Sequence, residues 1–166
     1  MIAAARRAVS GLRRNLATNP RQLAKSWYMF YFQLPFLPEL GLRRENGRQL
    51  ARSLRALARS PRAFTEEDLE RYREAWSKPG AATGMLNWYR AMLRASPEIP
   101  SDVRVKVPTL MIWGKQDTAL GSELAPQSID LCDDGRLVFI DEAGHFVQHD
   151  EPERVSELIA DFLPKP

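Results

Sequence analysis

The stretch DEAGHFVQHDEPERV, Asp141 to Val155, decides how the C-terminal part of this chain folds. The apolar run from Leu137 to Ile140 just before it predicts a buried strand, and apolar residues recur behind it at helical spacing. His145, which follows Gly144, is therefore expected on a loop between a strand and a closing helix. A histidine on such a loop suits a catalytic base, although a loop histidine without a chemical role fits the same pattern.

The closing helix is predicted from an apolar face made of Val155, Leu158, Ile159, Phe162 and Leu163. Pro152 suits its first turn, and Asp150 or Glu151 just ahead would favour the positive end of its dipole. His149 lies among acidic residues and is interpreted as a surface or structural residue.

A second strand end lies upstream in VPTLMIWGKQD, Val107 to Asp117. Leu110 to Trp113 is a short apolar strand followed by Gly114 and then an acid. Two strands, each followed by a helix, predict a β-α-β-α segment of a parallel sheet. Such strands are buried on both faces and need neighbours, so we expect an incomplete fold that self-associates or is partly molten. Asp117 either orients His145 or caps the following helix.

The first hundred residues follow a different, helical pattern. The run from Thr65 to Asp68 is a capping-box start, and Met85, Trp88, Tyr89 and Met92 repeat at helical spacing. WYMFYFQLPFLP, Trp27 to Pro38, has no clean period and two prolines, which predicts an irregular connection. We therefore predict a helical region over residues 1–100 and a βα region over 101–166, with the composition changing near Pro97 to Ser101.

Composition excludes several classes of protein. No apolar run approaches the roughly 18 residues of a membrane span. The first 62 residues are rich in basic side chains, but Arg44, Arg48, Arg52, Arg55 and Arg59 recur at helical spacing opposite leucines. That pattern describes the solvated face of an amphipathic helix, and no nucleic-acid recognition motif accompanies it. The single cysteine, Cys132, cannot form an internal disulfide, so a reducing cytoplasm is expected.

Taken together, these residues resemble the C-terminal half of an α/β-hydrolase, from its helical cap to its end, and the most similar subgroup is the epoxide hydrolases. In that fold nucleophile, acid and histidine follow one another along the chain, the last two on loops after late strands. Gly114 to Asp117 and Gly144 to Phe146 fall at those two positions. The resemblance implies Asp117 as the acid that orients His145, and His145 as the base that activates water, with no metal or organic cofactor.

The resemblance to epoxide hydrolases rests on the cap. SWYMFYFQLP around Tyr28 and LNWYRAM around Tyr89 are similar to the segments from which those enzymes point two tyrosines at the epoxide oxygen. A phenol stays protonated at neutral pH and can give its proton to the alkoxide that ring opening forms. Without the resemblance, both tyrosines would be interpreted as core aromatics. The residues implied at the substrate pocket are Trp27, Phe32, Trp88 and Phe146.

The nucleophile of that family is not found, because the sequence has no G-x-S-x-G or G-x-D-x-G, and no H-G-x-P either. We therefore expect the chain to be inert alone and to act on a small epoxide only beside a complementary N-terminal half. Two alternatives stay open. One is a dehalogenase half with the same acid and histidine, in which Trp27 and Trp88 would offer N–H groups to a halide. The other is a non-catalytic role, in which the sheet edge mediates self-association or binds a partner.

Overall fold

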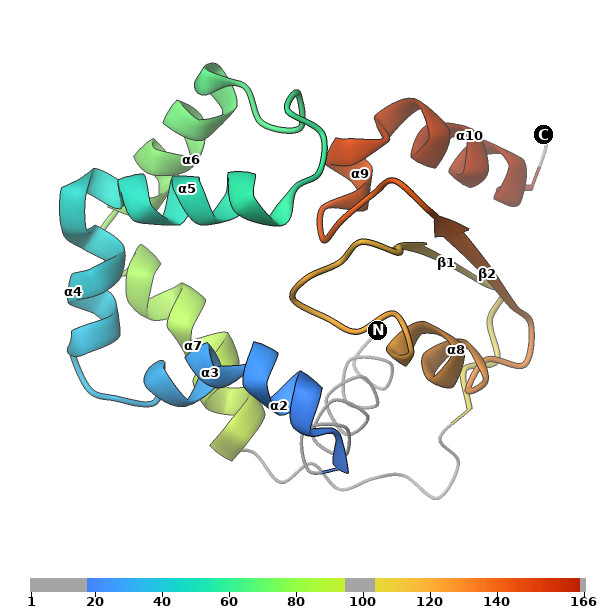
Figure 1. Cartoon of the computed structure of the whole chain (residues 1–166), viewed down its shortest axis with the longest axis horizontal. Helices are drawn as coiled ribbons and strands as arrows, with labels where there is room; N and C mark the ends of the chain where they lie inside the picture. Colours follow the sequence, from blue (N-terminus) through green and yellow to red (C-terminus); the bar gives the residue numbers. More distant parts are fainter. Residues whose placement is uncertain (1–17, 95–103, 165–166) are drawn as a thin grey trace.

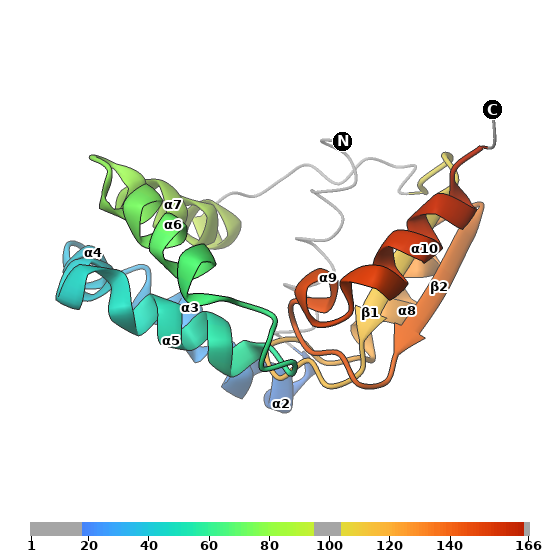
Figure 2. The same cartoon turned by 90° about the horizontal axis from the view of Figure 1, so that it is seen from above.

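The computed structural model describes residues 18–94 and 104–164, which form a helical region beside a small βα region (Figures 1 and 2). The composition change predicted near Pro97 to Ser101 and the helical pattern of residues 1–17 lie outside these ranges. The helical region contains α2 (Pro20–Lys25), α3 (Trp27–Tyr31), α4 (Leu37–Arg43), the 3-10 helix η1 (Arg44–Gly47), α5 (Arg48–Leu57), α6 (Glu66–Ser77) and α7 (Ala81–Arg94). The βα region contains β1 (Thr109–Gly114), α8 (Leu124–Ile129), β2 (Gly135–Ile140), α9 (Val147–Asp150) and α10 (Pro152–Phe162).

The two strands of the described residues pair in parallel, with Thr109 opposite Gly135 and Gly114 opposite Ile140. One face of this sheet packs against α10 in a cluster centred on Ile140, Val155 and Leu158. The connecting helix α8 contacts both strands and lies on the other side of them in Figure 1. The parallel β-α-β-α arrangement predicted from the sequence is therefore confirmed.

The closing helix buries a narrower stripe than its sequence predicts. Val155 and Leu158 are buried, but Ile159 is 45% exposed and Leu163 is 55% exposed. Leu163 comes after the last helical residue, and α10 has only two described strands to cover. The prediction that both residues belong to the inner face is therefore wrong for the described part of the chain. Pro152 does occupy the first turn of the helix, as expected.

The capping box predicted at Thr65 is confirmed at the start of α6. The Thr65 hydroxyl accepts a hydrogen bond from the backbone N–H of Asp68 at 3.1 Å, and the Asp68 carboxylate accepts one from the Thr65 N–H at 3.0 Å. Hydrogen bonds from Thr65 hold the pKa of the Asp68 carboxyl below its ordinary 3.8. Behind this start, Phe64 and Leu69 pack with Ala51 of α5, which joins the two helices in one core.

Two stretches differ from their predicted form. Trp27–Tyr31 is the short helix α3 and not an irregular connection, because Met29 packs inward (2% exposed) and holds that turn. Pro38 does not disrupt α4, because it stands in the first turn, where a proline leaves no hydrogen bond unmade. The arginine-rich helix is shorter than its spacing suggests, since Gly47 adopts φ +74° and α5 begins only at Arg48.

None of the helices in the described ranges combines the length and the apolar character that crossing a membrane would require.

Candidate active site

The loops that follow β1 and β2 lie against each other. The N–H of Lys115 donates to the carbonyl of Ile140 at 3.0 Å, and that of Gln116 donates to the carbonyl of Ala143 at 2.9 Å. Gly114 permits this approach, because a Cβ there would overlap the backbone oxygens of residues 143 and 144. The two parallel strands thus deliver Asp117 and His145 to the same edge of the sheet.

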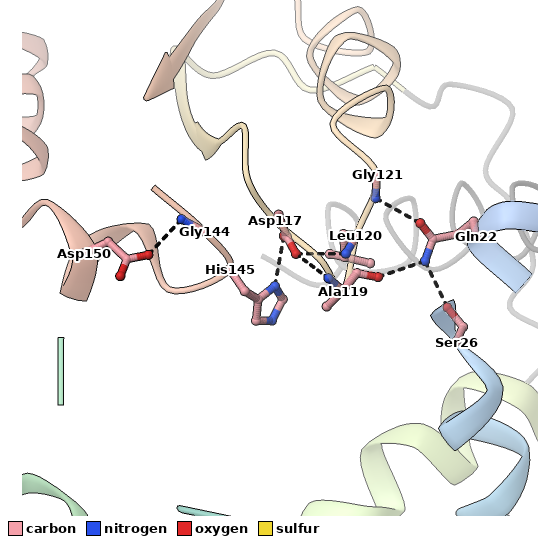
Figure 3. A network of polar contacts seen from close by, with 9 residues as sticks. All are labelled: Gln22, Ser26, Asp117, Ala119, Leu120, Gly121, Gly144, His145 and Asp150. Carbon is pink, nitrogen blue, oxygen red and sulfur yellow. Dashed lines mark hydrogen bonds and ion pairs between the residues drawn. The ribbon is translucent and has the colours of Figure 1, made fainter. Parts of the chain in front are cut away.

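Asp117 and His145 form a hydrogen-bonded pair, with 2.9 Å between His145 Nδ1 and Asp117 Oδ2 (Figure 3). The other carboxylate oxygen, Oδ1, accepts hydrogen bonds from the N–H groups of Ala119 at 2.7 Å and Leu120 at 2.9 Å. Asp117 therefore orients the histidine and holds a backbone turn at once. It does not cap α8, which begins seven residues later, at Leu124.

The electrostatics of the pair favour an ionised acid. Burial raises the pKa of the Asp117 carboxyl, but the hydrogen bonds that it accepts from His145 and from two backbone amides outweigh burial, and the pKa lies below its ordinary 3.8. A carboxylate only accepts hydrogen bonds, so Nδ1 of His145 carries the proton and donates it to Asp117 Oδ2. In the neutral imidazole, Nε2 then has a free lone pair and can accept a proton.

The loop after β2 that carries His145, the histidine loop, is hydrogen-bonded to residues 57–60 at the end of α5. Asp150, only 6% exposed, accepts N–H bonds from Arg59 at 2.8 Å and Ser60 at 2.9 Å through Oδ1, and from Gly144 at 2.8 Å through Oδ2. The N–H of His145 donates to the carbonyl of Leu57 at 3.2 Å. Asp150 was interpreted from the sequence only as a favourable charge before α10. Nothing in the sequence signals its three backbone partners, two of which lie about ninety positions away.

The loop after β1 that carries Asp117 is hydrogen-bonded to α2 through Gln22, which is 1% exposed. Its side-chain NH₂ donates to the carbonyl of Ala119 at 3.1 Å and to the Ser26 hydroxyl at 3.0 Å, and its Oε1 accepts from the N–H of Gly121 at 2.9 Å (Figure 3). Gln22 was not predicted from the sequence as a site residue. A glutamine in a short helix carries no pattern that would reveal a contact almost a hundred residues away.

Tyr28 of α3 and Tyr89 of α7 meet edge to face, with 5.7 Å between ring centroids and an interplanar angle of 82°. Phe32 packs against both rings, at 5.5 Å from Tyr28 and 5.0 Å from Tyr89. Burial raises the pKa of both phenols above 10.0, and the pKa of Tyr28 is raised further by Tyr89 and by the Asp117 carboxylate. The structure therefore brings the two tyrosines together, with Tyr28 within electrostatic reach of Asp117.

The other aromatic residues named from the sequence are placed differently. Phe146 lies 5.0 Å from the His145 ring and 5.2 Å from Phe64, so it links the histidine to the helical core. Trp27 and Trp88 are 66% and 76% exposed in the described structure, and the Trp27 ring lies 6.4 Å from that of Tyr31. His149 packs on Phe64 at 4.5 Å between centroids, a structural contact.

The part of the chain that the structure describes contains no group of three or more His, Cys, Asp or Glu placed to hold a metal ion.

Comparisons with known proteins identify the family. Residues 1–158 match the model of the Alpha/beta hydrolase family. The chain is 45% identical over 145 residues to the AB hydrolase superfamily protein YfhM of Bacillus subtilis (strain 168), covering 87% of this chain and 50% of that protein. It is 34% identical over 150 residues to Epoxide hydrolase 4 of Homo sapiens, covering 87% of this chain and 41% of that protein.

A solved structure shows the same arrangement. The epoxide hydrolase of Bacillus megaterium, crystallised with an inhibitor, superimposes with a TM-score of 0.77 at 26% identity, over 93% of this chain and 57% of that one. The chain spans about half the length of the curated relatives that it matches. The family match, the parallel strands and the order of acid and histidine agree, and the chain therefore belongs to the alpha/beta hydrolase family.

Proposed function

We propose that this chain supplies the cap and the acid–histidine pair of an epoxide hydrolase. The observation that carries the proposal is the convergence of two half-buried phenols, Tyr28 and Tyr89, near a hydrogen-bonded Asp117–His145 pair. The relatives described as epoxide hydrolases support it. In the proposed division, residues 1–100 form the cap and residues 101–166 belong to the catalytic core.

The proposed reaction has two steps. First, an aspartate outside this chain attacks one epoxide carbon, the carbon–oxygen bond breaks, and Tyr28 or Tyr89 protonates the alkoxide to leave a hydroxyalkyl ester. Second, His145 removes a proton from water, and the hydroxide attacks the ester carbonyl. The bond between the carbonyl carbon and the ester oxygen breaks, and the departing alkoxide takes the proton of the newly formed carboxylic acid, which releases the diol and regenerates the aspartate. The proton held by His145 returns to the tyrosinate.

The raised pKa of both phenols fits the first step. A phenol that stays protonated is a donor over the whole neutral range, and two donors on one oxygen stabilise the charge that develops there. The lowered pKa of Asp117 fits the second step, since an ionised acid stabilises the imidazolium that forms when His145 takes a proton.

The missing nucleophile defines the proposed partner. We propose that the chain is inactive alone and acts with an N-terminal hydrolase half that carries an aspartate nucleophile, or otherwise self-associates through its sheet edge. Because Cys132 is its only cysteine, the cytoplasm is the proposed location.

The test is to assay the purified chain with styrene oxide and with a haloalkane, with and without an N-terminal half taken from a relative. Epoxide opening only in the mixture is expected. Replacing Tyr28 and Tyr89 by Phe should abolish ring opening. The control is Tyr72→Phe, which should leave ring opening unchanged, because Tyr72 is exposed and stacks on Trp76. Halide release without epoxide opening would favour the dehalogenase alternative. A mixture that forms a folded complex and turns over neither substrate would favour a non-catalytic role.

A further inference from the structure

One buried side chain of the helical region, that of Gln22, binds the loop that carries Asp117. All three hydrogen bonds of the Gln22 amide that the structure records are buried or half-buried, and two of them end on the backbone of the loop, at Ala119 and Gly121. These two residues flank Leu120. The same short turn presents the N–H groups of Ala119 and Leu120 to the Asp117 carboxylate.

A second contact joins the same two segments. Asn19 accepts hydrogen bonds from the N–H groups of Arg21 and Gln22 through its side-chain oxygen, which fixes the start of α2. Its side-chain nitrogen donates to Glu123 at 3.0 Å, two residues beyond Gly121. This bond is exposed and contributes little, so the buried amide of Gln22 is the principal link.

We propose that Gln22 is a positioning residue: it fixes the turn at Ala119–Gly121, which orients Asp117, which in turn orients His145. The proposal rests on the function proposed above for that pair. Peptide groups on both sides of the turn are bound by one planar amide, so the turn cannot rotate without breaking at least one bond to Gln22. Rotation of the turn would carry the Ala119 N–H away from Asp117 Oδ1.

Gln22 should therefore affect one chemical step more than the other. The tyrosines act in ring opening, whereas Asp117 and His145 act in ester hydrolysis. Loss of Gln22 should slow ester hydrolysis on the order of tenfold and leave ester formation nearly unchanged, since about one backbone hydrogen bond to Asp117 is lost. A role limited to folding would lower both steps in proportion to the amount of folded protein.

The first test needs only the chain. In Gln22→Leu, amide hydrogen exchange followed by NMR should speed up roughly tenfold at Ala119, Leu120 and Gly121, while the amides of β1 keep their wild-type rates. The Nδ1 proton resonance of His145 should broaden or disappear. Gln127→Leu, in which an exposed glutamine of α8 is changed, is the matched control.

If Gln22→Leu does not fold, Gln22→Glu allows the same exchange measurement, because it replaces the hydrogen-bond donor of the side chain. Glu in place of Gln22 retains an acceptor for the Gly121 N–H but cannot donate to the Ala119 carbonyl. In Gln22→Glu, the amides of Ala119 and Leu120 should therefore exchange faster, while the Gly121 amide stays protected. Wild-type exchange at Ala119 and Leu120 in either folded variant would overturn the proposal.

The second test uses the chain mixed with the N-terminal half, in a single turnover of styrene oxide. Gln22→Leu should form the ester at the wild-type rate and hydrolyse it about tenfold more slowly. Equal slowing of both steps would show that Gln22 serves only folding. A mixture in which even the unmodified chain is silent would count against the proposed function, and the exchange measurement would still decide the role of Gln22.

Discussion

Replacing Asp150 by Ala should destabilise the whole chain, because this one carboxyl group joins the histidine loop to the end of α5. The group is 6% exposed and accepts three backbone hydrogen bonds, at 2.8, 2.9 and 2.8 Å. Alanine leaves all three N–H groups, those of Arg59, Ser60 and Gly144, without their acceptor.

The magnitude follows from these bonds. A hydrogen bond to a charged acceptor contributes about 1.5–3 kcal/mol, and the three share one acceptor group and are not additive, so we expect a loss of about 3–5 kcal/mol in the free energy of unfolding. That is a large part of the roughly 5–15 kcal/mol that an ordinary domain has. Asp150→Asn keeps one acceptor oxygen and should lose about 1.5–3 kcal/mol.

The measurement is urea unfolding at one fixed protein concentration, which removes any contribution from association. Asp161→Ala, at an exposed aspartate of α10, is the control and should change the free energy of unfolding by less than about 0.5 kcal/mol. A similarly small change for Asp150→Ala would refute the view that this residue fastens the histidine loop.

Further predictions concern pH, packing and association. Because the pKa of Asp117 is lowered in the folded chain, its contribution to stability is present above about pH 4 and lost as pH falls further. The urea concentration at the midpoint of unfolding should therefore fall below about pH 4, and Asp117→Asn should make that fall smaller. Because the pKa of Tyr28 and Tyr89 is raised, these phenols ionise at lower pH in the unfolded chain than in the folded one, and stability should fall as pH rises past about 10. An ultraviolet titration of the folded chain should show phenol ionisation at a pH above the ordinary range, and the variant with Phe at both positions should lack it. Gly144→Ala should weaken the contact with α5, since a Cβ there would lie 2.7 Å from the Leu57 carbonyl, and protease cleavage at the loop should speed up. Size-exclusion chromatography should show concentration-dependent association, whereas a sharp monomer that unfolds cooperatively would contradict that expectation.

Local patterns were sufficient to predict much of the fold. The alternation of strand and helix after residue 104, the capping box at Thr65 and the helical spacing around Tyr89 all depend on neighbours in the sequence, and the structure confirms them. The short helix at Trp27 was missed because its stability comes from the buried Met29 and not from periodicity.

The pairing of Asp117 with His145 was expected from the resemblance to α/β-hydrolases, and the structure places the two side chains in contact. The residues that hold their loops were not predictable in the same way. Gln22 and Asp150 act through backbone groups far along the chain, and neither the identity nor the spacing of those partners is encoded near them. Such contacts become visible only when the helical region and the sheet are seen together (Figure 3).

The proposed ester intermediate can be detected from the intact mass of the N-terminal half after it is mixed with the chain and with styrene oxide. With His145→Gln, the mass of that half should rise by one epoxide, because the ester forms and no base is left to activate water. The unmodified chain and His149→Gln, which changes the chain's other histidine, should give diol without an accumulated ester. Normal turnover by His145→Gln, or the absence of any covalent adduct in a folded mixture, would contradict the account.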